Sequence, residues 1–287
     1  MNREAASIIM AIMYAARMAR FDLLRAVGHL ARKLTKWTDL EDKKLRRIVE
    51  YIHSTYDVRL TGFIRDDSSE LSLVQYSDAD FASDRGDAKS TSGLFLALVG
   101  PTTFFPLAAH SRKQAAVSHS TAEAEVVAAE DSMRELGVPA LDLWETILER
   151  EVKVQLLEDN QTTAINIRTG RFPKLRHVQR MHGVNIRWLY DGIQRGIFSV
   201  QDCHTQRMAA DIFTKHFTSK DSWDHAVRML GFRSENFTRT MVLCPSVPSG
   251  LSPLPPLPNV CRSPPPRNVL EVFAFCHVPN LTSDAFP

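Results

Sequence analysis

Four acidic residues of this sequence stand at the ends of predicted strands and helices, where carboxylates are placed to bind or react. Asp78 follows a predicted strand over residues 71–76, and Asp159 follows another over residues 152–157. If these two strands are parallel neighbours, both acids lie in the crevice outside their carboxyl ends, where α/β sheets bind ligands.

The other two acids belong to predicted helices. Glu125 lies in the first turns of a helix over residues 120–136, on a stripe of small and apolar residues that should face the sheet. Glu123 is about 200° round the same helix, so we expect it to face solvent. Asp211 lies among small and apolar residues of a helix over 208–215, where a carboxylate is costly unless it is paired.

Four carboxylates that converge on one crevice repel one another, and hard divalent cations bound through oxygen relieve that repulsion. The sequence therefore predicts a site for two Mg²⁺ ions, with Mn²⁺ as the alternative. Two such ions about 4 Å apart can activate a water and stabilise the leaving oxygen of a phosphodiester. Taken singly, each acid also fits an ordinary turn, cap or helix-dipole role. The combination of all four favours the metal site.

The elements that must position these acids alternate between strand and helix. Short links join the first three strands, which favours antiparallel pairing. The order predicts an α/β fold with a mixed five-stranded sheet and helices on its faces. The predicted strands cover residues 71–76, 93–99, 103–108, 152–157 and 197–201, and the predicted helices cover 120–136, 141–148, 161–167, 178–194 and 208–215.

The formal net charge of +2 is the sum of three segments that differ in their own net charge. Residues 1–65 have a mostly helical pattern and a net charge of +6, residues 66–217 carry −5, and residues 218–287 carry +1. The basic faces of the first segment fit a surface that holds a nucleic-acid duplex, and they fit a plain solvated helix face equally well. The apolar run 5–16 resembles a secretory signal, but Glu4 and the arginines after the run favour an amphipathic helix.

Composition excludes several classes of protein. Hydrophobic residues make up 44% and charged residues 24% of the 287, which excludes a wholly disordered, collagen-like or coiled-coil chain. No apolar run approaches the roughly 18 residues of a membrane span. The 4 cysteines form no C-x-x-C pair, which favours a reducing compartment. Most of the 15 prolines lie at or after Pro245, which predicts a polyproline-like or disordered tail from about 245, with a short isolated strand over 269–275.

Six short motifs follow one another through the middle of the chain. They are residues 76–80 (YSDAD), 84–93 (DRGDAKSTSG), 112–114 (RKQ), 120–125 (STAEAE), 158–161 (EDNQ) and 210–215 (ADIFTK). In this order and spacing they resemble the ribonuclease H domain of copia-type LTR retrotransposon Pol polyproteins. The resemblance covers residues 66–217, and residues 1–65 more weakly resemble the C-terminal end of the reverse transcriptase just upstream.

The resemblance implies a ribonuclease H-like fold and an enzyme, a two-magnesium hydrolase that cuts the RNA strand of RNA–DNA hybrids endonucleolytically. Matched position by position, the metal-binding and catalytic acids are Asp78, Glu125, Asp159 and Asp211. The loop residue His204 is a further catalytic candidate for proton transfer or product release, and it fits a plain surface histidine equally well.

Substrate contacts are expected beside these acids. Basic and amide residues precede the helix over 120–136, and a helix N-terminus attracts phosphate. A protein that binds hybrids reads phosphates and 2′-hydroxyls rather than base edges. Each of these residues also fits a solvated loop. The candidates are Lys89, Ser90, Thr91, Arg112, Lys113, Gln114, Asn160 and Gln161.

The sequence departs from the family pattern at positions other than the metal ligands. Phe81 stands where the family usually has Trp, and residues 108–111 (AAHS) replace a stretch that commonly holds a Trp-Ser pair. No Tyr/Phe-x-Asp-Asp run occurs in residues 1–65, so no polymerase activity is expected. The alternative to an active enzyme is a catalytically silent, nucleic-acid-binding remnant of such a polyprotein.

The resemblance also implies the setting in which the protein works. Its partners would be an RNA–DNA hybrid and an upstream reverse transcriptase domain, with no membrane and no small-molecule cofactor. It would act in the cytoplasm, within a virus-like particle, or in the nucleus, and it would not be secreted. We expect the chain to be the C-terminal piece of a longer polyprotein, or a gene remnant, with an unrelated tail after about residue 235.

Overall fold

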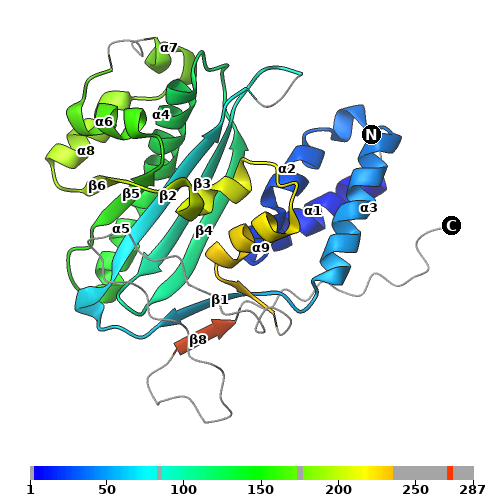
Figure 1. Ribbon diagram of the computed structural model, residues 1–287, viewed down its shortest axis with the longest axis horizontal. Helices are drawn as coiled ribbons and strands as arrows, with labels where there is room; N and C mark the ends of the chain where they lie inside the picture. The colour runs from blue at the N-terminus through cyan, green and yellow to red at the C-terminus, as the bar shows by residue number, and fades with distance from the viewer. Residues whose placement is uncertain (1–2, 83–85, 173–176, 235–269, 274–287) are drawn as a thin grey trace.

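A computed structural model describes residues 3–82, 86–172, 177–234 and 270–273 of the chain (Figure 1). Most of the predicted proline-rich tail, with Cys244, Cys261 and Cys276, lies outside these described residues. Cys203, the one cysteine within them, is buried and forms no disulfide.

Five strands form the centre of the sheet, in the order β6-β5-β2-β3-β4. β2 (Ser72–Asp80), β3 (Thr91–Val99) and β4 (Phe104–Lys113) pair antiparallel. β5 (Val154–Glu158) is parallel to β2, and β6 (Phe198–Asp202) is parallel to β5. Short links suffice for the antiparallel strands, whereas the parallel ones need helical crossovers. This is the mixed α/β sheet that the sequence predicts, and the ribonuclease H-like fold class is confirmed.

Three further strands extend the sheet beyond β4. β1 (Arg59–Ile64) pairs antiparallel with β4, and β7 (Phe232–Arg233) and β8 (Leu270–Phe273) both pair with β1. The expected count of five strands is therefore too low, and the strand expected to stand alone in the tail lies against β1. The two-residue β7 is too short to show the alternation by which a sequence reveals a strand.

The sheet takes strands from all three predicted segments. β1 comes from residues 1–65, the five central strands from residues 66–217, and β7 and β8 from residues 218–287. The division of the chain into these segments as separate units stays a prediction.

Side-chain alternation along β2 and β3 explains why helices cover both faces. Tyr76 and Phe95 belong to one buried cluster, whereas Leu73 and Leu96 belong to the other, as the two-residue period of a strand requires. Figure 1 shows the two groups of helices on opposite sides of the sheet. The first cluster is covered by α1 (Arg3–Met18), α2 (Leu24–Ala31), α3 (Asp39–Ser54) and α9 (Lys220–Met229), and the second by α4 (Thr121–Ser132), α5 (Val138–Leu148), α6 (Gln161–Thr169) and α8 (Ile186–Gln194).

Two predicted helices differ from those in the structure. The helix expected over 178–194 is broken into α7 (Val178–His182) and α8, because Gly183 between them takes φ +70°, a conformation that ends helices. The helix expected over 208–215 is a short 3₁₀ helix, η6 (Ala209–Phe213).

The N-terminal apolar run forms the amphipathic helix that the sequence favours. Ala5, Ile9 and Ala16 of α1 are buried in the same cluster as Tyr76 and Phe95 of the sheet. Among the described residues, no helix has both the length and the apolar character needed to cross a membrane.

Phe95 provides a test of this core. Its ring centroid lies 5.8 Å from that of Tyr76, 6.4 Å from Phe104 and 6.5 Å from Phe213, and the residue is 0% exposed. We expect Phe95→Ala to lower the free energy of unfolding, measured by urea denaturation, by about 3–5 kcal/mol because it leaves a cavity. Phe81→Ala is the control, since Phe81 is 40% exposed; equal losses in both variants would contradict this account.

Candidate active site

Asp78 and Asp159 lie at the same end of the sheet. β2 and β5 are parallel neighbours, with Tyr76 opposite Leu157, so their carboxyl ends meet. Asp78 lies in β2 and is 2% exposed, and Asp159 is the first residue after β5. The sequence predicts a crevice there only if the two strands are parallel neighbours, and the structure shows that they are.

Glu125 and Asp211 reach the same place from α4 and η6. Oxygens of Asp78, Asp159 and Asp211 lie within 4.8 Å of one another, and oxygens of Glu125, Glu158 and Asp159 form a second such set. Asp159 belongs to both sets. The structure thus brings all four predicted acids, together with Glu158, into one carboxylate cluster, and their roles as metal ligands stay a prediction.

Sequence reasoning did not single out Glu158, the last residue of β5. It is 0% exposed, and it accepts hydrogen bonds from the Ser77 hydroxyl at 3.1 Å and from the Asn160 backbone N–H at 3.3 Å. Strand alternation puts it on the face of Leu156, which belongs to the cluster that α4 covers. Applying that alternation to the Glu-Asp pair would have indicated that Glu158 points toward the helix of Glu125.

Burial dominates the electrostatics of the cluster. It raises the pKa of Glu125, and the charges of Glu158 and Asp78 raise it further. Burial likewise raises the pKa of Glu158 well above its usual range, with Asp159 adding to the effect. One buried oxygen, Glu125 Oε2, has no hydrogen-bond partner among the described residues. Hard oxygen donors that repel one another and are incompletely satisfied suit Mg²⁺ or Mn²⁺.

A glycine in β3 lets η6 approach the sheet. A Cβ added to Gly93 would come 2.7 Å from Thr214 Cγ2 and 2.8 Å from the Ala210 carbonyl oxygen. From the next strand, the Ser111 hydroxyl donates a 2.7 Å hydrogen bond to the Phe213 carbonyl. These contacts hold the 3₁₀ helix, and with it Asp211, against the end of the sheet.

His204 belongs to neither set of carboxylates. It precedes a short 3₁₀ helix (Thr205–Arg207), where its Nδ1 accepts a 3.2 Å hydrogen bond from the Gln206 backbone N–H, and the residue is exposed. The structure thus gives His204 a local capping contact, and its catalytic role stays a prediction.

Three of the predicted substrate contacts, Ser90, Thr91 and Gln114, are buried. Gln114 is 4% exposed, and its amide donates to the Ser92 hydroxyl at 3.0 Å and to the Ala124 carbonyl at 2.9 Å, which joins α4 to β3. Ser90 is 0% exposed, and its hydroxyl accepts a hydrogen bond from the Ala82 backbone N–H at 3.2 Å. The Gln114 and Ser90 side chains hold the elements of the site together, and their contact with substrate stays a prediction.

The three cations among the predicted substrate contacts all have partners within the chain. Arg112 pairs with Glu135, and Lys113 Nζ lies 2.6 Å from Asp87 Oδ1. Lys89 Nζ donates a 2.6 Å hydrogen bond to a backbone carbonyl in the link before α4. A phosphate would have to compete with these partners, so their contact with substrate stays a prediction.

The remaining predicted contacts flank the cluster. Asn160 caps α6 by accepting a 3.1 Å hydrogen bond from the Thr163 N–H, and the exposed Gln161 begins that helix. Thr91 opens β3 opposite Asp80. Their contact with substrate also stays a prediction.

Glu123 is buried, and the expectation that it faces solvent is wrong. It is 1% exposed; its Oε2 accepts a 2.9 Å hydrogen bond from the His119 N–H, and its Oε1 lies 3.2 Å from His182 Nε2. The segment around α7 covers this side of α4, which a helical wheel cannot show. As predicted, Glu125 rather than Glu123 points into the cluster.

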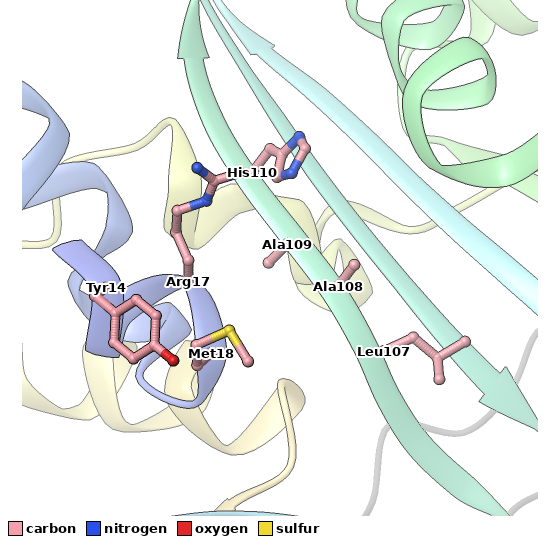
Figure 2. Close-up of a pocket in the computed structure, with 7 residues that line it drawn as sticks. All are labelled: Tyr14, Arg17, Met18, Leu107, Ala108, Ala109 and His110. Atoms are coloured by element: carbon pink, nitrogen blue, oxygen red, sulfur yellow. The ribbon is translucent and has the colours of Figure 1, made fainter. Parts of the chain in front are cut away.

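A pocket of about 330 Å³ lies between α1 and β4, and no acid of the carboxylate cluster lines it (Figure 2). Tyr14, Arg17 and Met18 line it from the helix, and residues 107–110 line it from the strand.

The chain is similar in sequence to Pol polyproteins from transposons and to a secreted effector protein. It is 27% identical over 215 residues, 74% of its length, to the retrovirus-related Pol polyprotein from transposon RE2 of Arabidopsis thaliana. It is 33% identical over 147 residues to the secreted RxLR effector protein 161 of Plasmopara viticola, which covers 51% of this chain and 94% of that protein. The chain is thus a homologue of retrovirus-related Pol polyproteins from transposons. It spans 14% of the length of the RE2 polyprotein.

No family model matches the chain. Among solved structures it is similar to ribonuclease H1 of Halobacterium salinarum, with 14% identity and a TM-score of 0.34 over 50% of this chain and 94% of that one. The strand order, rather than this superposition, identifies the fold of the chain.

Asp211 gives the metal-free protein a pH dependence. Burial, followed by the charge of Asp78, raises the pKa of Asp211 to about 7, above the value of about 4 in an unfolded chain. Between these values the folded chain holds a proton that the unfolded chain has lost, so stability falls as pH rises. Without divalent ions, we expect the free energy of unfolding to be lower at pH 8 than at pH 5, by on the order of 1–3 kcal/mol.

Urea denaturation in a chelator at the two pH values measures this difference. Asp211→Asn removes the titrating group, so it should reduce the difference between pH 5 and pH 8. A variant with the same pH dependence as the wild type would show that Asp211 is not its source.

Gly93 tests the close approach of η6. We expect Gly93→Ala to lower the free energy of unfolding by about 1–3 kcal/mol, because the new methyl group forces η6 away from β3. Gly28→Ala in α2 is the control, since its Cβ would meet no atom nearer than 3.8 Å and alanine is favoured in helices. Thermal denaturation compares the two, and a Gly93 variant as stable as the wild type would argue against tight contact there.

Proposed function

We propose that the chain is a metal-dependent ribonuclease that hydrolyses the RNA strand of RNA–DNA hybrids endonucleolytically, as part of a Pol polyprotein. The observation that carries the proposal is the convergence of Asp78, Glu125, Asp159 and Asp211 in two overlapping sets of carboxylates. The ribonuclease H-like fold and the transposon Pol relatives support it.

The residues present fit two Mg²⁺ or Mn²⁺ ions. Asp78, Asp159 and Asp211 would hold one ion, and Glu125 and Glu158 with the shared Asp159 would hold the other. Mg²⁺ binds such carboxylates at about 2.1 Å and keeps several waters. When bound, ions of this kind activate a water and stabilise the charge that develops on a phosphodiester.

The chain's own part is to hold these oxygens in place. The Thr214 hydroxyl donates a hydrogen bond to Asp78, and the Ser77 hydroxyl donates to Glu158. Because both donors come from elements that frame the site, the carboxylates keep their orientation before any ion or substrate arrives. Such preorganisation lets binding energy act on the reacting phosphate rather than on ordering the site.

Helix α2 carries positive charge to the edge of the site. Arg25 Nη2 lies 3.6 Å from Asp80 Oδ2 at the end of β2, and Arg25 Nη1 donates a 3.1 Å hydrogen bond to His216 Nδ1, just beyond η6. The basic helical segment therefore lies beside the carboxylate cluster, where it can hold the phosphates of a duplex. We propose that an upstream reverse transcriptase domain extends this surface, and that the protein acts in the cytoplasm, within a virus-like particle, or in the nucleus.

Asp159 is the sharpest test, because it belongs to both sets of carboxylates. We expect Asp159→Asn to slow Mg²⁺-dependent cleavage of a labelled RNA–DNA hybrid by about 100-fold or more, since loss of an outer partner of a metal ligand alone costs about 10- to 100-fold. A gel assay with the full chain measures the cleavage.

Asp191→Asn is the matched control, since Asp191 lies in α8 with a side chain 48% exposed. It should cleave at the wild-type rate. Equal cleavage by the two variants would sink the assignment. Salt-dependent binding of the hybrid by the wild type, without Mg²⁺-dependent cutting, would instead indicate a catalytically silent remnant.

A further inference from the structure

Lys215 reaches the carboxylate cluster from the residues that follow η6. Its Nζ donates a 2.7 Å hydrogen bond to Asp211 Oδ1 and lies 3.9 Å from Asp78 Oδ1. The Lys215 side chain is 41% exposed, whereas those of Asp78 and Asp211 are 3% and 13% exposed. The ammonium group therefore lies on the solvent side of both acids.

The surroundings of this ammonium explain its charge and its position. A lysine side chain is cationic at neutral pH, and the two carboxylates beside Lys215 favour that charged form. The Lys215 backbone N–H also donates a 2.8 Å hydrogen bond to the Asp211 carbonyl. The backbone thus holds the base of the side chain one turn beyond the acid that its ammonium contacts.

A divalent ion held by this set of carboxylates would compete with the ammonium for Asp211. An ion bound to Asp78, Asp159 and Asp211 would lie about 2.1 Å from its carboxylate oxygens, within a few ångström of an ammonium bonded to Asp211. Two cations so close in a partly buried site repel each other strongly. Lysine has a flexible four-carbon stem and is here partly exposed, so the ammonium is the group able to move.

We propose that Lys215 is a built-in counter-ion of the carboxylate cluster, which compensates Asp78 and Asp211 in the metal-free chain and must leave Asp211 before a divalent ion binds there. This inference rests on the proposed function, because it assumes that the carboxylate cluster binds divalent ions. Competition with the ammonium makes ion binding weaker than the carboxylates alone would allow. A neutral side chain of similar length at position 215 therefore strengthens it.

Calorimetric titration of the full chain with Mn²⁺, without substrate, tests the proposal. We expect Lys215→Met to lower the Kd for Mn²⁺ about tenfold, which corresponds to about 1.4 kcal/mol. Lys220→Met is the matched control, because Lys220 Nζ makes the same contact with an acid four residues away, 2.7 Å to Asp224 Oδ2 in α9, and its side chain is 84% exposed. Its Kd should equal that of the wild type.

Comparison with Asp159→Asn separates the two proposals. An unchanged or weaker affinity in Lys215→Met, with wild-type binding that Asp159→Asn abolishes, would overturn the counter-ion and leave the divalent-ion site standing. Absence of Mn²⁺ binding in both the wild type and Lys215→Met would overturn both.

A measurement on the wild type covers the case in which Lys215→Met does not fold. Brief acetylation followed by peptide mass spectrometry reports how readily each lysine reacts. Addition of Mn²⁺ should increase the labelling of Lys215 severalfold, because the ion frees it from Asp211, and should leave the labelling of Lys220 unchanged. Equal labelling of Lys215 with and without Mn²⁺ would refute the displacement.

Discussion

Mutual repulsion among buried carboxylates is the constraint on which this structure depends. Asp78, Glu125 and Glu158 are each at most 4% exposed, and burial raises the pKa of all three. Taking such charges out of water costs free energy that only pairing, hydrogen bonding or a cation offsets. The surrounding protein must therefore hold acids where repulsion would otherwise drive them apart.

The stiffness that this requires comes from strands packed on both faces. Tyr76 of β2 lies in one core and Leu73 in the other, so the end of the strand cannot shift without opening packed interior on one side. The N-terminal helices and α9 belong to the first of these cores. The basic segment is consequently part of the packing that supports the site, and through Arg25 it lies beside it.

Lys215 and a divalent ion can each offset the repulsion among the carboxylates. The ammonium carries one charge, is tethered to the chain and is present as soon as the protein folds; the ion carries two charges and exchanges with solvent. Lys215 stabilises a chain that folds before it binds metal. On our proposal, the same chain then needs the divalent ion for hydrolysis. The counter-ion would then lower the affinity of the site for the ion that replaces it.

Residue spacing alone determined the central strands and the orientation of Glu125, because strand alternation and helical stripes depend on residues two to four positions apart. It also placed Asp78 and Asp159 correctly once their strands proved parallel. Tertiary structure alone decided that Glu123 is buried beneath a distant segment and that the sheet continues through its edge strands. Burial and charge pairing act between side chains that packing brings within a few ångström, and no local pattern in the sequence records which of them will meet.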